Sequence, residues 1–154
     1  MERNFETVMI EQCSPVLAGL KAAGLFRYET QDCKDLAERV RGWNARLGEK
    51  GLRVRVLKGC TRTHRYLVYV YRENRLREVL SDENVRAFLV QEGYRLPEGA
   101  DDCEPLLRQL SQRLCCEAEF PHEIGVFLGY PLTDVVGFIE NQGRNFTCCG
   151  CWKA

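Results

Sequence analysis

The chain has 154 residues and no net formal charge, because 22 basic side chains balance 22 acidic ones. This length suits one domain around one hydrophobic core, and no linker, repeat or low-complexity stretch divides the chain, which predicts a single domain over residues 1–154. The first 15 residues mix acidic with apolar side chains, so we expect neither a secretory signal nor a membrane span. These features together predict a cytoplasmic protein.

The first elements are expected to be two helices with a strand between them. Ser14-Pro15 is typical of an N-cap followed by the first helical residue, and Gly24 is expected to end this helix. A strand is expected at about residues 25–28. Asp32 is expected to cap the second helix, which Gly48 or Gly51 closes and whose apolar stripe has helical spacing: Leu36, Val40, Trp43 and Leu47.

Two strands are expected in the middle of the chain. Residues 52–57 alternate between apolar and arginine side chains, which predicts a half-buried strand. Residues 65–71 are β-branched or aromatic almost throughout, so this strand is either buried on both faces or carries a tyrosine-rich outer face. Their short connection predicts an antiparallel hairpin.

The second half of the chain is expected to be mainly helical. Asp82 or Ser81 can cap a helix that ends near Gly93, and a turn is expected at residues 97–99. Further helices are expected at about 101–115, 122–128 and 133–140, with a last strand at 146–152. The fold class is therefore α+β: a small, mostly antiparallel sheet, made of the 52–71 hairpin and the last strand, covered by several helices.

The stretch EFPHEIGVFLGYP, residues 119–131, is the most unusual motif. A proline and a glutamate at a helix start have an ordinary structural explanation, because both suit the first turn. A functional interpretation needs His122 and Glu123 to face one cleft, where the imidazole could exchange a proton near neutral pH. Adjacent helical residues diverge by about 100 degrees, which weakens a catalytic dyad.

The motif FPHEIGxFLGYPxxDVxGFI, with the ending CGxWK, resembles the signature of a bacterial family catalogued as domain of unknown function 3793, found in anaerobic Firmicutes. Looser similarity extends to CSPVLAGLKAAGLF and RYLVYVYR. The resemblance implies a one-domain soluble protein without an established activity. The sequence departs from the family pattern at two places. Cys151 stands where an aromatic residue is expected, and the sequence ends just after Lys153, where similar proteins are expected to continue. The positions that it singles out are Cys13, Pro15, Lys21, Pro121, His122, Glu123, Gly125, Gly129, Tyr130, Pro131, Asp134, Gly137, Cys149, Gly150, Trp152 and Lys153.

The nine cysteines raise the question of a metal or redox site. An odd number of cysteines in a protein expected to be cytoplasmic argues against a disulfide framework. The cluster at Cys148, Cys149 and Cys151 does not have the pair-and-pair spacing of a closed zinc site, so small buried side chains are the simpler interpretation. A cysteine-ligated site using Cys149 and Cys151, with Cys115 or His122, is kept as an alternative, and the cofactor is unknown.

Cys13 is a candidate nucleophile. It precedes Ser14-Pro15, and a helix start at that point would lower the thiol pKa. Together with His122 it would provide a thiol and a base. No sequence feature places the two residues together, and the common motifs of nucleotide-binding proteins and hydrolases do not occur.

Residues 39–77 form a basic segment. An acidic or phosphate-bearing partner is one interpretation, and a solvated sheet face is the other. Nucleic acid is disfavoured, because the chain has zero net charge and no nucleic-acid-binding signature. The basic residues are Arg39, Arg41, Arg46, Lys50, Arg53, Arg55, Lys58, Arg62, Arg65, Arg72, Arg75 and Arg77.

The sequence thus favours an accessory protein that binds a small ligand or a protein partner. The expected ligand-binding residues are Cys13, Lys21, His122, Glu123 and Tyr130. A small enzyme with Cys13 as nucleophile and a cysteine-ligated metal or redox protein are the alternatives, and no catalytic residue is assigned.

Overall fold

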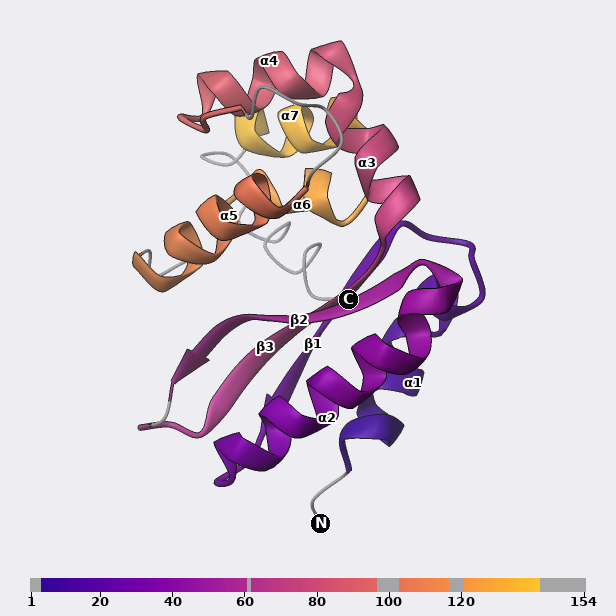
Figure 1. Cartoon of the computed structure of the whole chain (residues 1–154). Helices are drawn as coiled ribbons and strands as arrows, with labels where there is room; N and C mark the ends of the chain where they lie inside the picture. The colour runs from indigo at the N-terminus through magenta and orange to yellow at the C-terminus, as the bar shows by residue number, and fades with distance from the viewer. Residues whose placement is uncertain (1–3, 61, 97–102, 117–120, 142–154) are drawn as a thin grey trace. The chain divides into compact units, whose positions relative to one another are not determined.

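The computed structural model describes residues 4–60, 62–96, 103–116 and 121–141 (Figure 1). The chain divides into two compact units, residues 1–75 and 76–154. Within the described residues there are seven α-helices and a three-stranded antiparallel sheet, which confirms the α+β class. One domain for the whole chain stays a prediction, and the turn at 97–99 and the strand at 146–152 lie outside the described residues.

The sheet of the first unit consists of β1 (Ala23–Glu29), β2 (Leu52–Cys60) and β3 (Arg65–Arg72). Its order is β1-β3-β2 with antiparallel pairing throughout, so the predicted hairpin is confirmed. Because β1 and β2 both run antiparallel to β3, they are parallel to each other, and the chain between them forms a crossover with β3 inserted in the middle. The strand β2 extends beyond the predicted residue 57, through a register shift between Val56 and Lys58.

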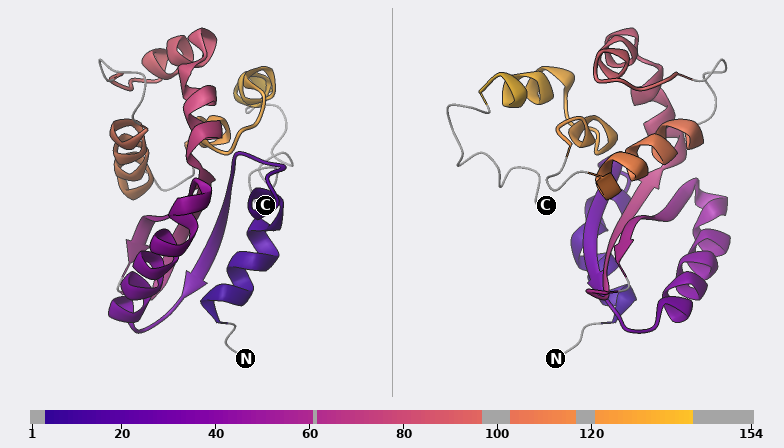
Figure 2. Two further views of the ribbon diagram at one scale, coloured as in Figure 1. Left: turned by 45° about the vertical axis from the view of Figure 1, so that its right-hand side comes forward. Right: turned by 90° about the vertical axis from the view of Figure 1, so that its left-hand side faces the viewer.

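The helices α1 (Phe5–Leu17) and α2 (Cys33–Leu47) run alongside the sheet (Figure 2). Cross-strand register aligns Phe26, Val68 and Val56, so these side chains share one face. The buried cluster on this face contains residues of both helices, and Phe5 makes edge-on ring contacts with Phe26 and Tyr28 at centroid distances of 5.4 Å. This face of the sheet and the two helices therefore form the core of the first unit.

The expected start of α1 at Ser14-Pro15 is wrong. The helix begins at Phe5, where the Asn4 side chain accepts a hydrogen bond from the Thr7 amide at 2.7 Å. Ser14-Pro15 instead follows a kink at Cys13, whose φ of −118° and ψ of 15° are not helical. A proline inside a helix has no N–H to donate and crowds the preceding turn, which accounts for the kink.

The expected end of α1 at Gly24 is also wrong. Gly19, with φ of +83°, follows the last turn of the helix. Its amide donates to the Val16 carbonyl, and the Leu20 amide donates to the Pro15 carbonyl, which is the pattern of a Schellman motif. Arg72 of β3 satisfies the end of the same helix, donating to the carbonyls of Val16 at 2.8 Å and Leu17 at 2.9 Å. A cation at a helix C-terminus also complements the helix dipole.

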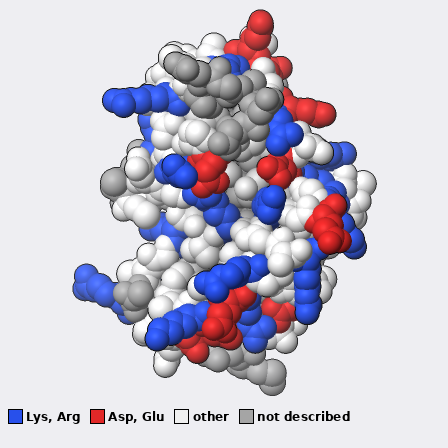
Figure 3. Space-filling view, viewed as in Figure 1, with Lys and Arg blue, Asp and Glu red and all other residues white. Residues whose placement is uncertain are grey.

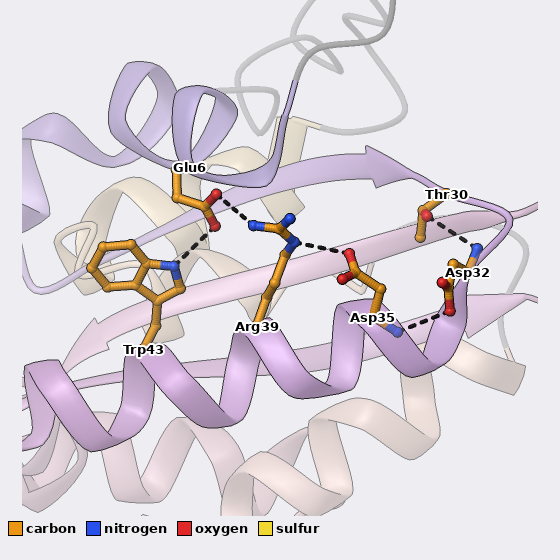
Figure 4. Close-up of polar contacts among 6 residues, drawn as sticks. All are labelled: Glu6, Thr30, Asp32, Asp35, Arg39 and Trp43. Atoms are coloured by element: carbon orange, nitrogen blue, oxygen red, sulfur yellow. Dashed lines mark hydrogen bonds and ion pairs between the residues drawn. The ribbon is translucent and has the colours of Figure 1, made fainter.

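A polar network links α1 with α2 (Figure 4). Glu6 of α1 accepts hydrogen bonds from Arg39 at 2.6 Å and from the Trp43 indole at 3.0 Å. Arg39 also binds Asp35 at 2.8 Å, one turn earlier in α2. The predicted cap of α2 is confirmed, since the Asp32 carboxylate accepts from the Asp35 amide. Trp43, predicted only as a member of the apolar stripe, thus also fixes α1 through its N–H.

The outer edge of β2 is closed by a side chain of α2. The Asn44 amide donates to the Val54 carbonyl at 2.8 Å and accepts from the Val54 amide at 2.7 Å. These are the two backbone groups that a further strand would use, so Asn44 protects this edge from pairing with another chain.

The second unit is helical in its described residues. It contains α4 (Glu83–Gln91), α5 (Glu104–Cys116), α6 (Ile124–Phe127) and α7 (Leu132–Asn141), and α3 (Glu73–Ser81) leads into it from the first unit. The predicted Asp82 cap of α4 is confirmed, because its carboxylate accepts from the amides of Asn84 and Val85. The apolar side chains buried in these helices include Leu76, Leu80, Phe88, Leu89, Leu106, Leu107, Leu110, Leu114, Ile124 and Phe127.

Candidate functional site

The PHEIG segment, which we define as residues 121–131, folds into one helical turn with a tight exit. The helix α6 is shorter than the predicted 122–128. Gly129 adopts φ of +86°, its amide donates to the Val126 carbonyl, and the Tyr130 amide donates to Gly125, which is again a Schellman motif. Gly129 therefore ends the helix. This structural role accounts for the glycine by itself, so a bound ligand is not needed to explain it.

Glu123 is the one buried charged side chain among the described residues, with 2% of its surface exposed. Its Oε2 accepts a hydrogen bond from the Tyr94 hydroxyl at 2.9 Å and one from Arg113 Nη1 at 3.2 Å. A buried carboxylate is tolerated only when a counter-charge and hydrogen bonds compensate its lost hydration. Glu123 is thus held by residues far from it in sequence, in the segment after α4 and in α5.

Arg113 joins this carboxylate to the end of α4. Its Nη2 donates to the Glu92 carbonyl, and its guanidinium lies over the Tyr94 ring at 4.4 Å from the centroid. Gly93, between these two residues, adopts φ of +100°, and a Cβ there would lie 2.6 Å from Arg113 Nη2. Glycine at this position therefore permits both the turn and the approach of the guanidinium.

Sequence reasoning selected Glu123 but missed both of its partners. For Arg113 a signal existed: it follows Leu106 by seven residues and Leu110 by three, which places a charge on the apolar face of its helix. An arginine in that position needs a buried acceptor. Nothing in the sequence pointed to Tyr94, because its hydroxyl reaches Glu123 only through tertiary folding.

The surface of the PHEIG segment is formed by its two ends. His122 and Tyr130 are half-buried, Gly129 and Pro131 are exposed, and the residues from Glu123 to Leu128 are buried. His122 and Glu123 consequently differ in environment, and Glu123 is engaged with Arg113 and Tyr94. The accessible groups of the segment are therefore part of the His122 imidazole, whose Nδ1 is buried, part of the Tyr130 phenol, and the exposed turn at Gly129 and Pro131.

Cys13 and Lys21, the other expected ligand-binding residues, belong to the first unit. The Cys13 side chain is fully buried, and burial raises the pKa of its thiol to about 12, although Lys21 acts in the opposite direction. The expectation that a helix N-terminus lowers this pKa is therefore wrong, because Cys13 lies within α1. A buried neutral thiol acts as a packing group. The Cys13 Sγ packs against Gly24, where an added Cβ would lie only 3.2 Å from it.

A different thiol has the environment of a reactive cysteine. The pKa of Cys60, at the end of β2, is lowered by hydrogen bonds from the Thr63 amide and hydroxyl, with smaller contributions from the amide and charge of Arg62. The side chain is half-buried. Sequence reasoning passed over Cys60, since only the turn geometry brings Thr63 back to it.

The metal alternative gains no support from the described part of the chain. Among those residues, no three His, Cys, Asp or Glu side chains are grouped so that they could hold a metal ion. Cys115 lies exposed near the end of α5. Cys149 and Cys151, on which the hypothesis depended, lie outside the described residues.

Several cations of the basic segment have partners within the first unit. Arg39 and Arg53 pair with carboxylates of Glu6 and Glu73, and Arg65 pairs with Glu29. The face in Figure 3 accordingly shows acidic side chains interspersed with basic ones. Residues 1–75 hold 15 basic and 9 acidic residues, whereas 76–154 hold 7 and 13. The charge asymmetry persists, and Arg39, Arg53 and Arg65 are already compensated by carboxylates.

The fold defines a small α+β protein with a buried polar network behind the PHEIG segment. A model of the family described as protein of unknown function, DUF3793, matches residues 9–154, so the chain belongs to that family. Neither the curated proteins nor the solved structures contain a match to it. Within the described residues, no helix combines the length and apolar character needed to cross a membrane.

Proposed function

We propose that this protein is a cytoplasmic accessory protein that binds a small ligand or a protein partner through the PHEIG segment, at His122, Tyr130 and Pro131. The observation that carries the proposal is the division within the segment. Its centre is buried and held by Arg113 and Tyr94, whereas His122 and Tyr130 are only half-buried and Pro131 is exposed. A rigid support under a few polar and aromatic groups is the arrangement that lowers the entropic cost of binding.

Binding is favoured over the Cys13 enzyme by the state of the thiol. A thiol with a pKa of about 12 that is fully buried supplies almost no thiolate at neutral pH. Glu123, for its part, is engaged by a cation and a phenol, so it is poorly suited to act as a general base.

The test is native mass spectrometry of protein purified without a tag under anaerobic conditions, compared with its denatured mass. An added mass or a co-purified chain identifies the bound species. His122→Ala and Tyr130→Ala should each weaken its binding about tenfold or more, the loss typical of a central contact residue. Thr133→Ala, an exposed neighbour in α7, is the matched control and should retain it. Unchanged binding in both variants would place the site elsewhere.

A further inference from the structure

Arg113 contacts two separate parts of the second unit, the turn at the end of α4 and the start of the PHEIG segment. It binds the carbonyl of Glu92 at the end of α4, lies over the ring of Tyr94, and pairs with Glu123 at 3.2 Å. Only 27% of its side-chain surface is exposed. A flexible surface arginine would not maintain contacts with both segments at once.

The glycine beside it supports a dedicated position for the guanidinium. A Cβ at Gly93 would lie only 2.6 Å from Arg113 Nη2, and the left-handed turn there directs the Glu92 carbonyl toward the same nitrogen. Arg72 binds helix-terminal carbonyls beside Gly19 in a similar way, but without a carboxylate comparable to Glu123. The carboxylate is therefore what distinguishes Arg113 from an ordinary helix-capping arginine.

We infer that Arg113 is the positioning residue of the PHEIG segment: through Glu123 it fixes how the segment presents His122 and Tyr130. The inference rests on the proposed function for its biological meaning, but not for its physical test. Glu123 is adjacent to His122, so the backbone that its buried carboxylate anchors also carries the imidazole. Tyr130 is tied to the same turn through its amide bond to the Gly125 carbonyl.

Removing both charges of the Arg113–Glu123 ion pair distinguishes an effect on the position of the PHEIG segment from an effect on stability alone. Arg113→Met alone leaves a buried carboxylate without its counter-charge and should lower the thermal midpoint clearly. Adding Glu123→Gln removes the charge and restores much of that loss, while Gln still accepts from Tyr94. Arg108→Met in the same helix is the matched control, because Arg108 is 70% exposed and pairs with Glu104 one turn away.

The decisive readout is amide hydrogen exchange of residues 124–130 in the free protein. In the double variant we expect exchange there to remain about tenfold or more faster than in the wild type, relative to α2, even where the thermal midpoint has recovered. Return of these amides to wild-type exchange in the double variant would overturn the inference, since the pair would then act on stability alone. Because no partner is used, this result is independent of the native-mass test.

Discussion

The reactivities of individual thiols provide a direct test of the environments described above. At pH 7.5 a thiol with the ordinary pKa of 9.0 is about 3% ionised, whereas one with a pKa of about 12 is only about 0.003% ionised. Since the thiolate is the nucleophile, ionisation alone should make Cys13 react about 1,000-fold more slowly than an ordinary thiol. Burial of the side chain slows it further, because the reagent must wait for an opening of the core.

The assay is timed alkylation with isotope-labelled iodoacetamide under anaerobic conditions, followed by peptide mapping. Cys13, Cys33 and Cys60 fall in different tryptic peptides, so one experiment follows all three. Cys33, exposed at the start of α2, is the internal comparison, and Cys60 should react faster than a thiol of ordinary pKa because its own is lowered. In denaturant the differences should disappear. A Cys13 rate within tenfold of that of Cys33 in the folded protein would refute the assigned environment and revive the nucleophile hypothesis.

Three further predictions concern stability. Because its pKa is raised, the Cys13 thiol contributes fully to the free energy of unfolding below pH 9.0 and loses that contribution as pH rises toward 12. In urea unfolding, the advantage of wild type over Cys13→Ala should therefore fall by about 1.4 kcal/mol per pH unit above pH 9, and a constant difference would contradict this. Gly93→Ala should lower stability by about 1–2 kcal/mol because of its left-handed backbone, and further because the new Cβ meets Arg113. Gly42→Ala, in the open middle of α2, should instead raise stability by about 0.5–1 kcal/mol, and equal thermal shifts of the two variants would argue against the turn geometry. Asn44→Ala removes both hydrogen bonds to Val54 and should lower the free energy of unfolding in chemical denaturation by about 1–3 kcal/mol. Hydrogen exchange of the Val54 amide should become faster, and unaltered exchange would show that Asn44 does not close this edge of the sheet.

Elements with a local cause were predictable from the sequence. Asp32 and Asp82 cap their helices as expected, because an aspartate needs only the next few amides to do so. Residues 52–57 and 65–71 form the predicted hairpin, because the two-residue period and β-branched composition are properties of the strands themselves. The family assignment likewise needed only the linear motif.

The start and end of α1 were not predictable in the same way. Ser14-Pro15 carries a genuine helix-start signal, yet the chain is already helical from Phe5, and the signal marks a kink. Gly19 and Gly24 are both plausible helix ends locally. Arg72, distant in sequence, donates to carbonyls in the last turn before Gly19, and Gly24 lies where the strand passes close to Cys13.

The candidate site shows the same division most clearly. The sequence by itself determined that residues 121–131 are unusual, that a helix begins there, and that Glu123 suits its first turn. Only the tertiary structure decided that Glu123 is buried against Arg113 and Tyr94 while His122 is half-buried, and that Cys13 is a protonated packing group. The physical reason is that burial and pairing of a charge depend on groups brought from other segments, whereas caps, periods and turns are decided within a few residues.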